Sequence, residues 1–275
     1  MEPMKEYLFD LCGYMVIPAA LDRDHVAAIN AWIDALPPLD PAKIQPNAPP
    51  QPDSAQWIGK VYTQSYGKVD GVNLQDIIEA GEIFERLIDH PAWIDPVRHF
   101  LGSHTKPYIH EIFVSLRTAG GYIWPHSGGH AADHNQRAGR RNLQWICTYL
   151  SLLVPLTDIG PGDGATVVVP ASHKSDLAHP QTRDGGAGAN CPGEALEGGS
   201  EIHLRAGDAL LFNDALLHGS AKRVNPGQRR MITIRYVPAE YAHRFGYEPS
   251  DELIGRLTPQ RREIVQPLPR RRSTQ

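Results

Sequence analysis

The sequence predicts a mainly β protein with flanking α-helices, built as an antiparallel barrel or a jelly roll. From residue 107 onward, short runs are rich in β-branched and aromatic residues, which favour strands. Turns rich in Gly, Pro and Asp separate these runs, and no helical pattern lies between them. This order favours antiparallel pairing over the alternating strands and helices of a parallel sheet.

The size and composition of the chain fit one globular domain. It has 275 residues, of which 41% are hydrophobic and 21% are charged. These values are typical of globular proteins and exclude disordered and fibrous classes. We expect a single domain over residues 1–275, with a helical N-terminal part at 1–105, a β core at 106–240 and a C-terminal extension at 241–275.

Helical periodicity is clearest in the N-terminal part. Apolar residues recur at helical spacing over residues 22–36, after a possible N-cap at Asp22 and before the two prolines that begin at Pro37. Two more helices are expected over 74–89 and 91–101, separated at Pro91.

The β core and the C-terminal extension complete the predicted elements. A glycine-rich insertion interrupts the strands at 183–200, and a short helix flanked by turns is expected within 245–259. The expected strands are 107–116, 143–154, 165–170, 200–205, 208–213 and 231–237.

Charge and cysteine usage exclude several functions. The 27 basic and 31 acidic residues give a net charge of −4, which argues against nucleic-acid binding. No apolar stretch is long enough to span a membrane, and the N-terminus lacks the order of a signal peptide. The 3 cysteines lie far apart in the sequence and offer no disulfide framework, which fits a protein of a reducing compartment. We expect a cytoplasmic protein that acts on a small molecule.

Two clusters of histidines can carry metal chemistry. The first spans residues 124–134 and places three histidines and one carboxylate around glycines, before a strand. The second spans 214–220 and follows the strand at 208–213. One histidine from each cluster, His126 and His218, together with one oxygen donor would leave open positions on Fe(II) for a cosubstrate and oxygen.

Arg229 strengthens this interpretation. It lies eleven residues beyond His218, at the start of a predicted strand. A guanidinium group can bind a carboxylate through two parallel hydrogen bonds, which a dicarboxylate such as 2-oxoglutarate requires at its far end. An arginine at this offset makes the two histidines more than isolated barrel residues.

With these residues in view, the sequence resembles the phytanoyl-CoA dioxygenase family of Fe(II)/2-oxoglutarate oxygenases. The opening at 10–18, followed by a helix, also looks like that of the family. The other motifs that carry the resemblance are 156–158 with 162–164, 169–174, 206–212, 218–220 and Arg229.

The resemblance implies a fold and a set of roles. The fold is a double-stranded β-helix, a cupin-like jelly roll whose mouth holds the iron. His218 matches the distal iron ligand, Ser220 and Arg229 match the residues that bind the far carboxylate of 2-oxoglutarate, and Trp145 matches an aromatic residue near the cosubstrate.

One position departs from the family pattern. The family has His-x-Asp, whereas here the residue two after His126 is Gly128. Asp133 can supply the missing ligand from a glycine-containing loop. Alternatively, water or halide fills the position, as in related halogenases, or the ligand is His130 or a carboxylate elsewhere, such as Glu111.

The predicted function is therefore that of an Fe(II)/2-oxoglutarate-dependent dioxygenase. With O2 as the oxidant, it would hydroxylate or otherwise oxidise a C–H bond of a small organic molecule and release succinate and CO2. The alternatives are a 2-oxoglutarate-dependent halogenase and a non-catalytic jelly-roll binding protein. Substrate specificity is expected to reside in the loops 37–70, 127–141 and 183–200.

Overall fold

A computed structural model describes most of the chain. The described residues are 1–40, 43–46, 56–65, 71–128, 138–141, 144–182, 191–241 and 248–268. Its α-helices are α1 (Pro3–Cys12), α2 (Arg23–Asp34), α3 (Glu82–Glu85), α4 (Ile94–Leu101), α5 (Asp251–Arg256) and α6 (Pro259–Val265), with short 3₁₀ helices that include η2 (Ile77–Ala80). Much of the predicted specificity loops, including 183–190 of the glycine-rich insertion, lies outside the described residues.

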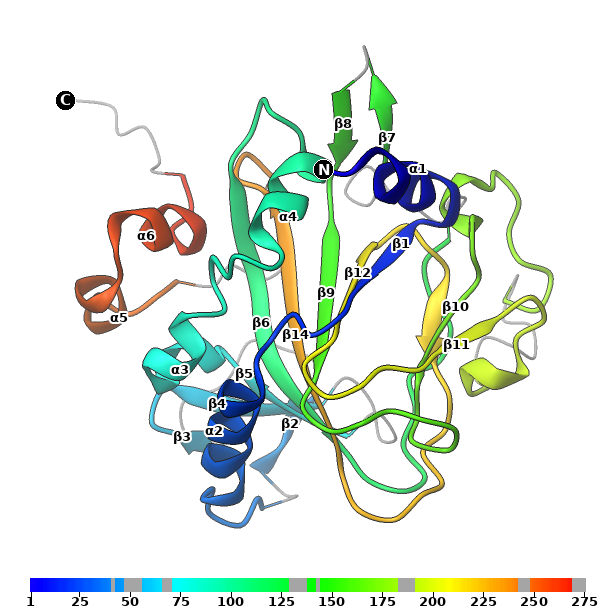
Figure 1. The fold of residues 1–275 in the computed structure, drawn as a ribbon. Coiled ribbons are helices and arrows are strands. Elements are labelled where there is room, and N and C mark those ends of the chain that lie inside the picture. Colours follow the sequence, from blue (N-terminus) through cyan, green and yellow to red (C-terminus); the bar gives the residue numbers. More distant parts are fainter. Residues whose placement is uncertain are drawn as a thin grey trace.

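Three sheets form the β part (Figure 1). The large sheet has the order β1-β12-β9-β14-β6-β5-β4-β2, with β3 paired to β4, and all its pairs except β2–β4 are antiparallel. Its strands are β1 (Tyr14–Ile17), β2 (Gln45–Pro46), β3 (Trp57–Ile58), β4 (Val61–Ser65), β5 (Val72–Gln75), β6 (Pro107–Arg117), β9 (Leu150–Pro155), β12 (Ala209–Asn213) and β14 (Arg229–Pro238). The others are the small sheet of β10 (Thr166–Val168), β11 (Ser200–Ile202) and β13 (His218–Ser220), and the hairpin of β7 (Ala138–Arg141) and β8 (Gln144–Cys147).

The large sheet is covered on both faces. Figure 1 shows helices α3, α4, α5 and α6 to one side of this sheet and strands β10 and β11 to the other. On β9, Leu152 packs in the main core with the helices, whereas Leu153 contacts the core that contains Val168 of the small sheet. Successive side chains of a strand point to opposite faces, so the alternation of β9 separates the two layers. The expected mainly β architecture is confirmed.

The main core draws residues from all three predicted parts of the chain. Ile29 of α2, Ile234 of β14 and Val265 of α6 belong to one cluster of buried apolar side chains. We infer from this shared core that residues 1–275 form one domain.

Helix α2 forms as the sequence predicts. The Asp22 carboxylate accepts a hydrogen bond from the backbone N–H of His25 at 2.7 Å, which is the expected N-cap. Ile29 and Ile33, one turn apart, are buried against the main core. Helix α4 likewise lies inside the expected range 91–101.

The helix predicted over 74–89 is wrong. Its first residues complete strand β5, which pairs with β6 and β4. The chain then takes positive φ angles at Asp76 (59°) and Gly81 (127°), so that only η2 and α3 form. The apolar residues that suggested one amphipathic helix are instead buried in separate turns.

Other boundaries also differ from the prediction. The run 143–154 is divided into β8 and β9 by residues 148–149, because the hairpin partner of β8 is β7 while β9 joins the large sheet. Helix α1 was not expected. Helix α5 lies within the range 245–259 where a short helix was expected, and the described part of the C-terminal extension contains a further helix, α6.

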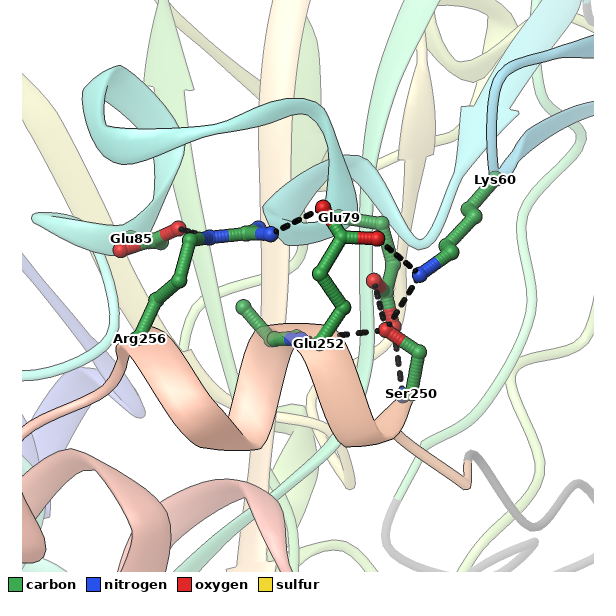
Figure 2. A network of polar contacts seen from close by, with 7 residues as sticks. Lys60, Glu79, Glu85, Ser250, Glu252 and Arg256 are labelled. Atoms are coloured by element: carbon green, nitrogen blue, oxygen red, sulfur yellow. Dashed lines mark hydrogen bonds and ion pairs between the residues drawn. The ribbon is translucent and has the colours of Figure 1, made fainter.

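A network of polar contacts attaches α5 to the rest of the molecule (Figure 2). Ser250 caps the helix by accepting from the N–H of Leu253, and its own N–H donates to the Glu79 carboxylate at 2.8 Å. Arg256 donates from Nε to Oε1 of the buried Glu85 at 3.0 Å. At the exposed edge of the network, Lys60 pairs with Glu252 at 2.7 Å.

Replacement of Arg256 by Met is expected to lower the free energy of unfolding by about 2 kcal/mol, because the buried Glu85 carboxylate loses a charged hydrogen-bond donor. The control Lys60→Met removes an exposed ion pair with Glu252 and should lower the free energy of unfolding far less. Urea denaturation followed by circular dichroism measures both. Equal losses in the two variants would contradict the role given to Glu85.

Candidate active site

His126 and His218 lie directly opposite each other. Their backbones exchange both hydrogen bonds of an antiparallel bridge, with the N–H of His126 donating to His218 O at 2.8 Å and the reverse bond at 3.1 Å. Opposite residues of an antiparallel pair place their side chains on the same face. The two imidazole rings accordingly have centroids 4.1 Å apart.

Gly219 permits this close approach. A Cβ atom at Gly219 would lie 2.9 Å from the carbonyl oxygen of Ile123 and 3.0 Å from the nitrogen of Pro125. These residues belong to the segment that runs beside β13 and leads to His126. A larger residue between His218 and Ser220 would push this segment away, and the His126–His218 pairing would be lost.

Both imidazoles are fixed in the same tautomer. Nδ1–H of His126 donates to the carbonyl oxygen of Trp124 at 3.0 Å, and Nδ1–H of His218 donates to that of Leu216 at 2.7 Å. Each Nε2 therefore carries the lone pair, as a metal-binding imidazole requires. Burial lowers the pKa of His126, and burial together with the neighbouring His126 lowers the pKa of His218 to about 3. Both rings are thus neutral at physiological pH.

Two buried arginines lie at the other end of β13. Arg117 of β6 and Arg229 of β14 are direct partners in the sheet register, and Arg117 Nη1 donates to the hydroxyl of Ser220 at 2.8 Å. Arg229 is 3% exposed, and its Nε finds no hydrogen-bond partner among the described residues. Burial and the charges of Arg117 and Arg223 hold the pKa of Arg229 well below its usual value.

The inner face of the large sheet continues as a row of polar side chains. Ser151 of β9 donates to Asp214 Oδ1 at 2.9 Å, and Arg235 of β14 pairs with Glu111 of β6. The other Glu111 oxygen accepts from Gln75 of β5 at 3.0 Å. The register places Arg235 opposite both Ser151 and Glu111.

Asp214 connects this row to the histidines. Its Oδ1 lies 3.9 Å from Nε2 of His218, and the residue is 6% exposed. Burial acts to raise the pKa of Asp214, but its electrostatic interactions with the nearby His218 and with the Arg235 guanidinium outweigh burial, so that the pKa is lowered. The carboxylate is ionised beside the imidazole pair.

The structure does not bring any of the expected third ligands to the two imidazoles among the described residues. Asp133 and His130 lie outside the described residues. Both oxygens of Glu111 are engaged by Gln75 and Arg235, so Glu111 is held in the polar row. Within the described ranges, no three His, Cys, Asp or Glu side chains converge into a ready-made metal cluster.

Trp145 packs in the main hydrophobic core. Its ring packs edge-on against Phe9 and Phe100 in the main core, and its indole N–H donates to the Glu6 carboxylate at 2.6 Å. These contacts hold α1 against β8. They give no support to the cosubstrate role that the resemblance implied for Trp145.

Arg117 and Asp214 are site residues that the sequence did not identify. Arg117 immediately follows the predicted strand 107–116, and the pairing of β6 with β14 brings it opposite Arg229. Asp214 was visible as part of the second histidine cluster, four residues before His218, but nothing in the sequence distinguished it from a turn residue. Its proximity to Nε2 is a consequence of the turn between β12 and β13.

The comparison with protein families decides the class of the molecule. The model of the phytanoyl-CoA dioxygenase (PhyH) family matches residues 9–231. The chain belongs to this family. The resemblance inferred from the sequence is confirmed, and the chain belongs with the Fe(II)/2-oxoglutarate-dependent dioxygenases.

Curated PhyH-like relatives are distant. The ectoine dioxygenase of Streptomyces avermitilis is 25% identical over 252 residues, which cover 83% of this chain and 76% of the relative. The dioxygenase cdmD of Talaromyces verruculosus is 29% identical over 127 residues, or 46% of this chain. That match spans 38% of the length of cdmD.

Solved structures confirm the cupin-like jelly roll. HygX from Streptomyces hygroscopicus, with nickel and 2-oxoglutarate bound, superimposes with a TM-score of 0.69 at 21% identity, covering 88% of each chain. EctD from S. alaskensis in its apo form gives a TM-score of 0.59 at 21% identity, covering 87% of this chain and 78% of EctD. No described helix of this PhyH-family chain is long and apolar enough to cross a bilayer.

Asp76 provides a test of the electrostatics of the polar row. Burial and the carboxylates of Glu111 and Glu79 raise the pKa of Asp76 from 3.8 to about 8. The folded state therefore retains a proton that the unfolded state releases, so this contribution to stability is lost as the pH rises between these two values.

The variant Asp76→Asn should remove this pH dependence, and Asn tolerates the left-handed backbone at this position. We expect the variant to become increasingly more stable than the wild type as the pH rises from about 5 to about 8. Urea denaturation at several pH values measures the difference. A difference that stays constant with pH would contradict the raised pKa.

Proposed function

We propose that this dioxygenase oxidises a C–H bond of a small organic molecule, by hydroxylation or a related reaction, with succinate and CO2 as co-products. One observation carries the proposal. Arg229 is buried opposite Arg117 without a hydrogen-bond partner for its Nε among the described residues, and both lie beside the strand that bears His218.

Buried charges in proteins are normally paired, because an unpaired ion in the interior loses its hydration without compensation. Two adjacent guanidinium groups and the Ser220 hydroxyl therefore form a binding site for an anion. Arg229 has the planar donor geometry that binds a carboxylate through two hydrogen bonds. The distal carboxylate of 2-oxoglutarate fits this donor set.

The spacing along β13 supports the same cosubstrate. His218 and Ser220 are two residues apart, so their side chains share one face and lie roughly 7 Å apart along the strand. A five-carbon dicarboxylate extends over such a length. It can reach the arginines with one end while its other end lies at the imidazoles.

His126 and His218 fit the iron. Their Nε2 atoms carry lone pairs, both rings are neutral, and each Nδ1–H is held by a backbone carbonyl. When bound together, Fe(II) and 2-oxoglutarate supply the activation of O2. The chain itself would fix the ligand nitrogens and neutralise the distal carboxylate at the buried Arg229, where little water competes for its donors.

The substrate class follows from the relatives and from the inner face. One relative is named for ectoine, and HygX is also known with hygromycin B bound. Both are small molecules. The polar side chains beyond the histidines, Ser151, Arg235 and Glu111, favour a substrate with hydrogen-bonding groups.

Gly128 supports a second candidate, a 2-oxoglutarate-dependent halogenase. The residue adopts a φ of 111° and carries no side chain at the position where the family has its carboxylate. A halide ion in the vacated coordination position would redirect the reaction from hydroxylation to halogenation. Product analysis in the presence and absence of chloride separates the two.

Replacement of Arg229 by Met should weaken 2-oxoglutarate binding about 100-fold, because the distal carboxylate loses its charged donor. Arg230→Met is the matched control, since Arg230 lies on the same strand but pairs with Asp34. Anaerobic calorimetric titration with Fe(II) present measures both affinities. Unchanged binding by the Arg229 variant would refute the anion site.

Replacement of either His126 or His218 by Ala should reduce Co(II) affinity about 100-fold or more, since each supplies a nitrogen ligand. His203→Ala is the control, because that imidazole is exposed and contacts Glu201. Titration of the metal-free protein gives the dissociation constants. Wild-type affinity in either variant would remove that histidine from the site.

A further inference from the structure

We propose that Asp214 supplies the carboxylate of the metal site in place of the residue that Gly128 replaces. This inference rests on the proposed function, in that His126 and His218 are the nitrogen ligands. It assigns the third ligand to the turn between β12 and β13, on the same segment as His218.

The first support is the position of the carboxylate. Asp214 Oδ1 lies 3.9 Å from His218 Nε2, the atom that carries the metal-binding lone pair. Among the described residues, Asp214 is the one acidic side chain that contacts either imidazole in this way. Adjacent ligands at about 2.1 Å from a metal, at a right angle, lie about 3 Å apart. The separation of Asp214 Oδ1 and His218 Nε2 is thus about 1 Å longer than that of two adjacent ligands, and among the described residues the three groups do not form a cluster.

The second support is the place of Gly128. Its N–H donates to the carbonyl oxygen of Ala215 at 3.0 Å. Position 128, which bears the carboxylate in the family, is therefore hydrogen-bonded to Ala215, the neighbour of Asp214 in the chain. A carboxylate on either segment enters the same region, so the exchange of an aspartate at 128 for one at 214 preserves the charge there.

The third support is the way the turn holds Asp214. The N–H of Leu216 donates to Asn213 O at 3.0 Å, and the N–H of Ala215 donates to the Asn213 side chain at 3.1 Å. Ser151 then donates to Asp214 Oδ1 at 2.9 Å. Metal-binding carboxylates are commonly oriented by such outer hydrogen bonds. Both oxygens of Glu111, the other buried carboxylate of the inner face, are engaged by Gln75 and Arg235.

This assignment also bears on the choice between the two candidate reactions. With Asp214 bound, the coordination position left by Gly128 is filled by the protein and is closed to halide. Hydroxylation is then the expected reaction. Removal of the Asp214 carboxylate would open the position, and halide could then enter it.

The test compares Asp214→Asn with Glu111→Gln, which makes the same change in a buried carboxylate of the polar row, and with Asp133→Asn. Co(II) affinity of the metal-free proteins and the visible spectrum of bound Co(II), with and without chloride, are measured. Asp214→Asn should bind Co(II) about 100-fold more weakly, and its spectrum should become sensitive to chloride, whereas the other two variants should match the wild type.

The outcomes separate this inference from the proposed function. Wild-type affinity and spectrum in Asp214→Asn would overturn the assignment of Asp214. Loss of the metal in Asp133→Asn would then identify Asp133 as the ligand, and a wild-type spectrum that responds to chloride would indicate an open position. Wild-type affinity in His126→Ala would instead overturn the proposed function. If Asp214→Asn does not fold, Ser151→Ala replaces it, with an expected loss of about 10-fold and a shifted Co(II) spectrum. An unchanged spectrum in Ser151→Ala would count against Asp214.

Discussion

The register between β6 and β14 is the constraint on which the site depends. It sets Arg229 opposite Arg117 at one end and Arg235 opposite Glu111 near the other. A shift of one residue would turn every side chain of β14 to the opposite face. The anion site would then face the helices, and the buried Ile234 would face the polar interior. The apolar face of β14 therefore fixes the position of the guanidinium groups.

Burial of both faces of the large sheet gives these groups their chemistry. The helices cover the apolar face, and the small sheet covers the inner face, so Arg229 has lost its water. A guanidinium group in this position is costly for the empty protein and binds a carboxylate strongly, because no solvent competes for its donors. Burial of the unpaired guanidinium lowers the free energy of unfolding, and binding of an anion would raise it again.

The sequence carried the parts of the site that are local. Strand runs from residue 107 onward and the Asp22 cap could be read from short patterns, and the structure confirms them. The offset between His218 and Arg229 could also be read from the sequence, and its link to 2-oxoglutarate is a proposal. The roles of Arg117 and Asp214 depend on long-range pairing and on a turn conformation that no short pattern encodes. The helix predicted over 74–89 failed for a similar reason, since its apolar spacing also fits a strand followed by two turns at Asp76 and Gly81.

If Asp214 is the third ligand, the ligand carboxylate has moved between two segments without loss of charge. The segment that carries His126 and Gly128 is bonded along its length to the segment that carries Asp214 and His218, through the bridge at the histidines and the bond from Gly128 to Ala215. Two backbones held together in this way can exchange a side chain between them while the imidazoles stay in place. A glycine at 128 then removes bulk from one side of the metal site, and the carboxylate on the other segment retains the negative charge. The family motif would be broken in sequence, whereas the donor set would be conserved in space.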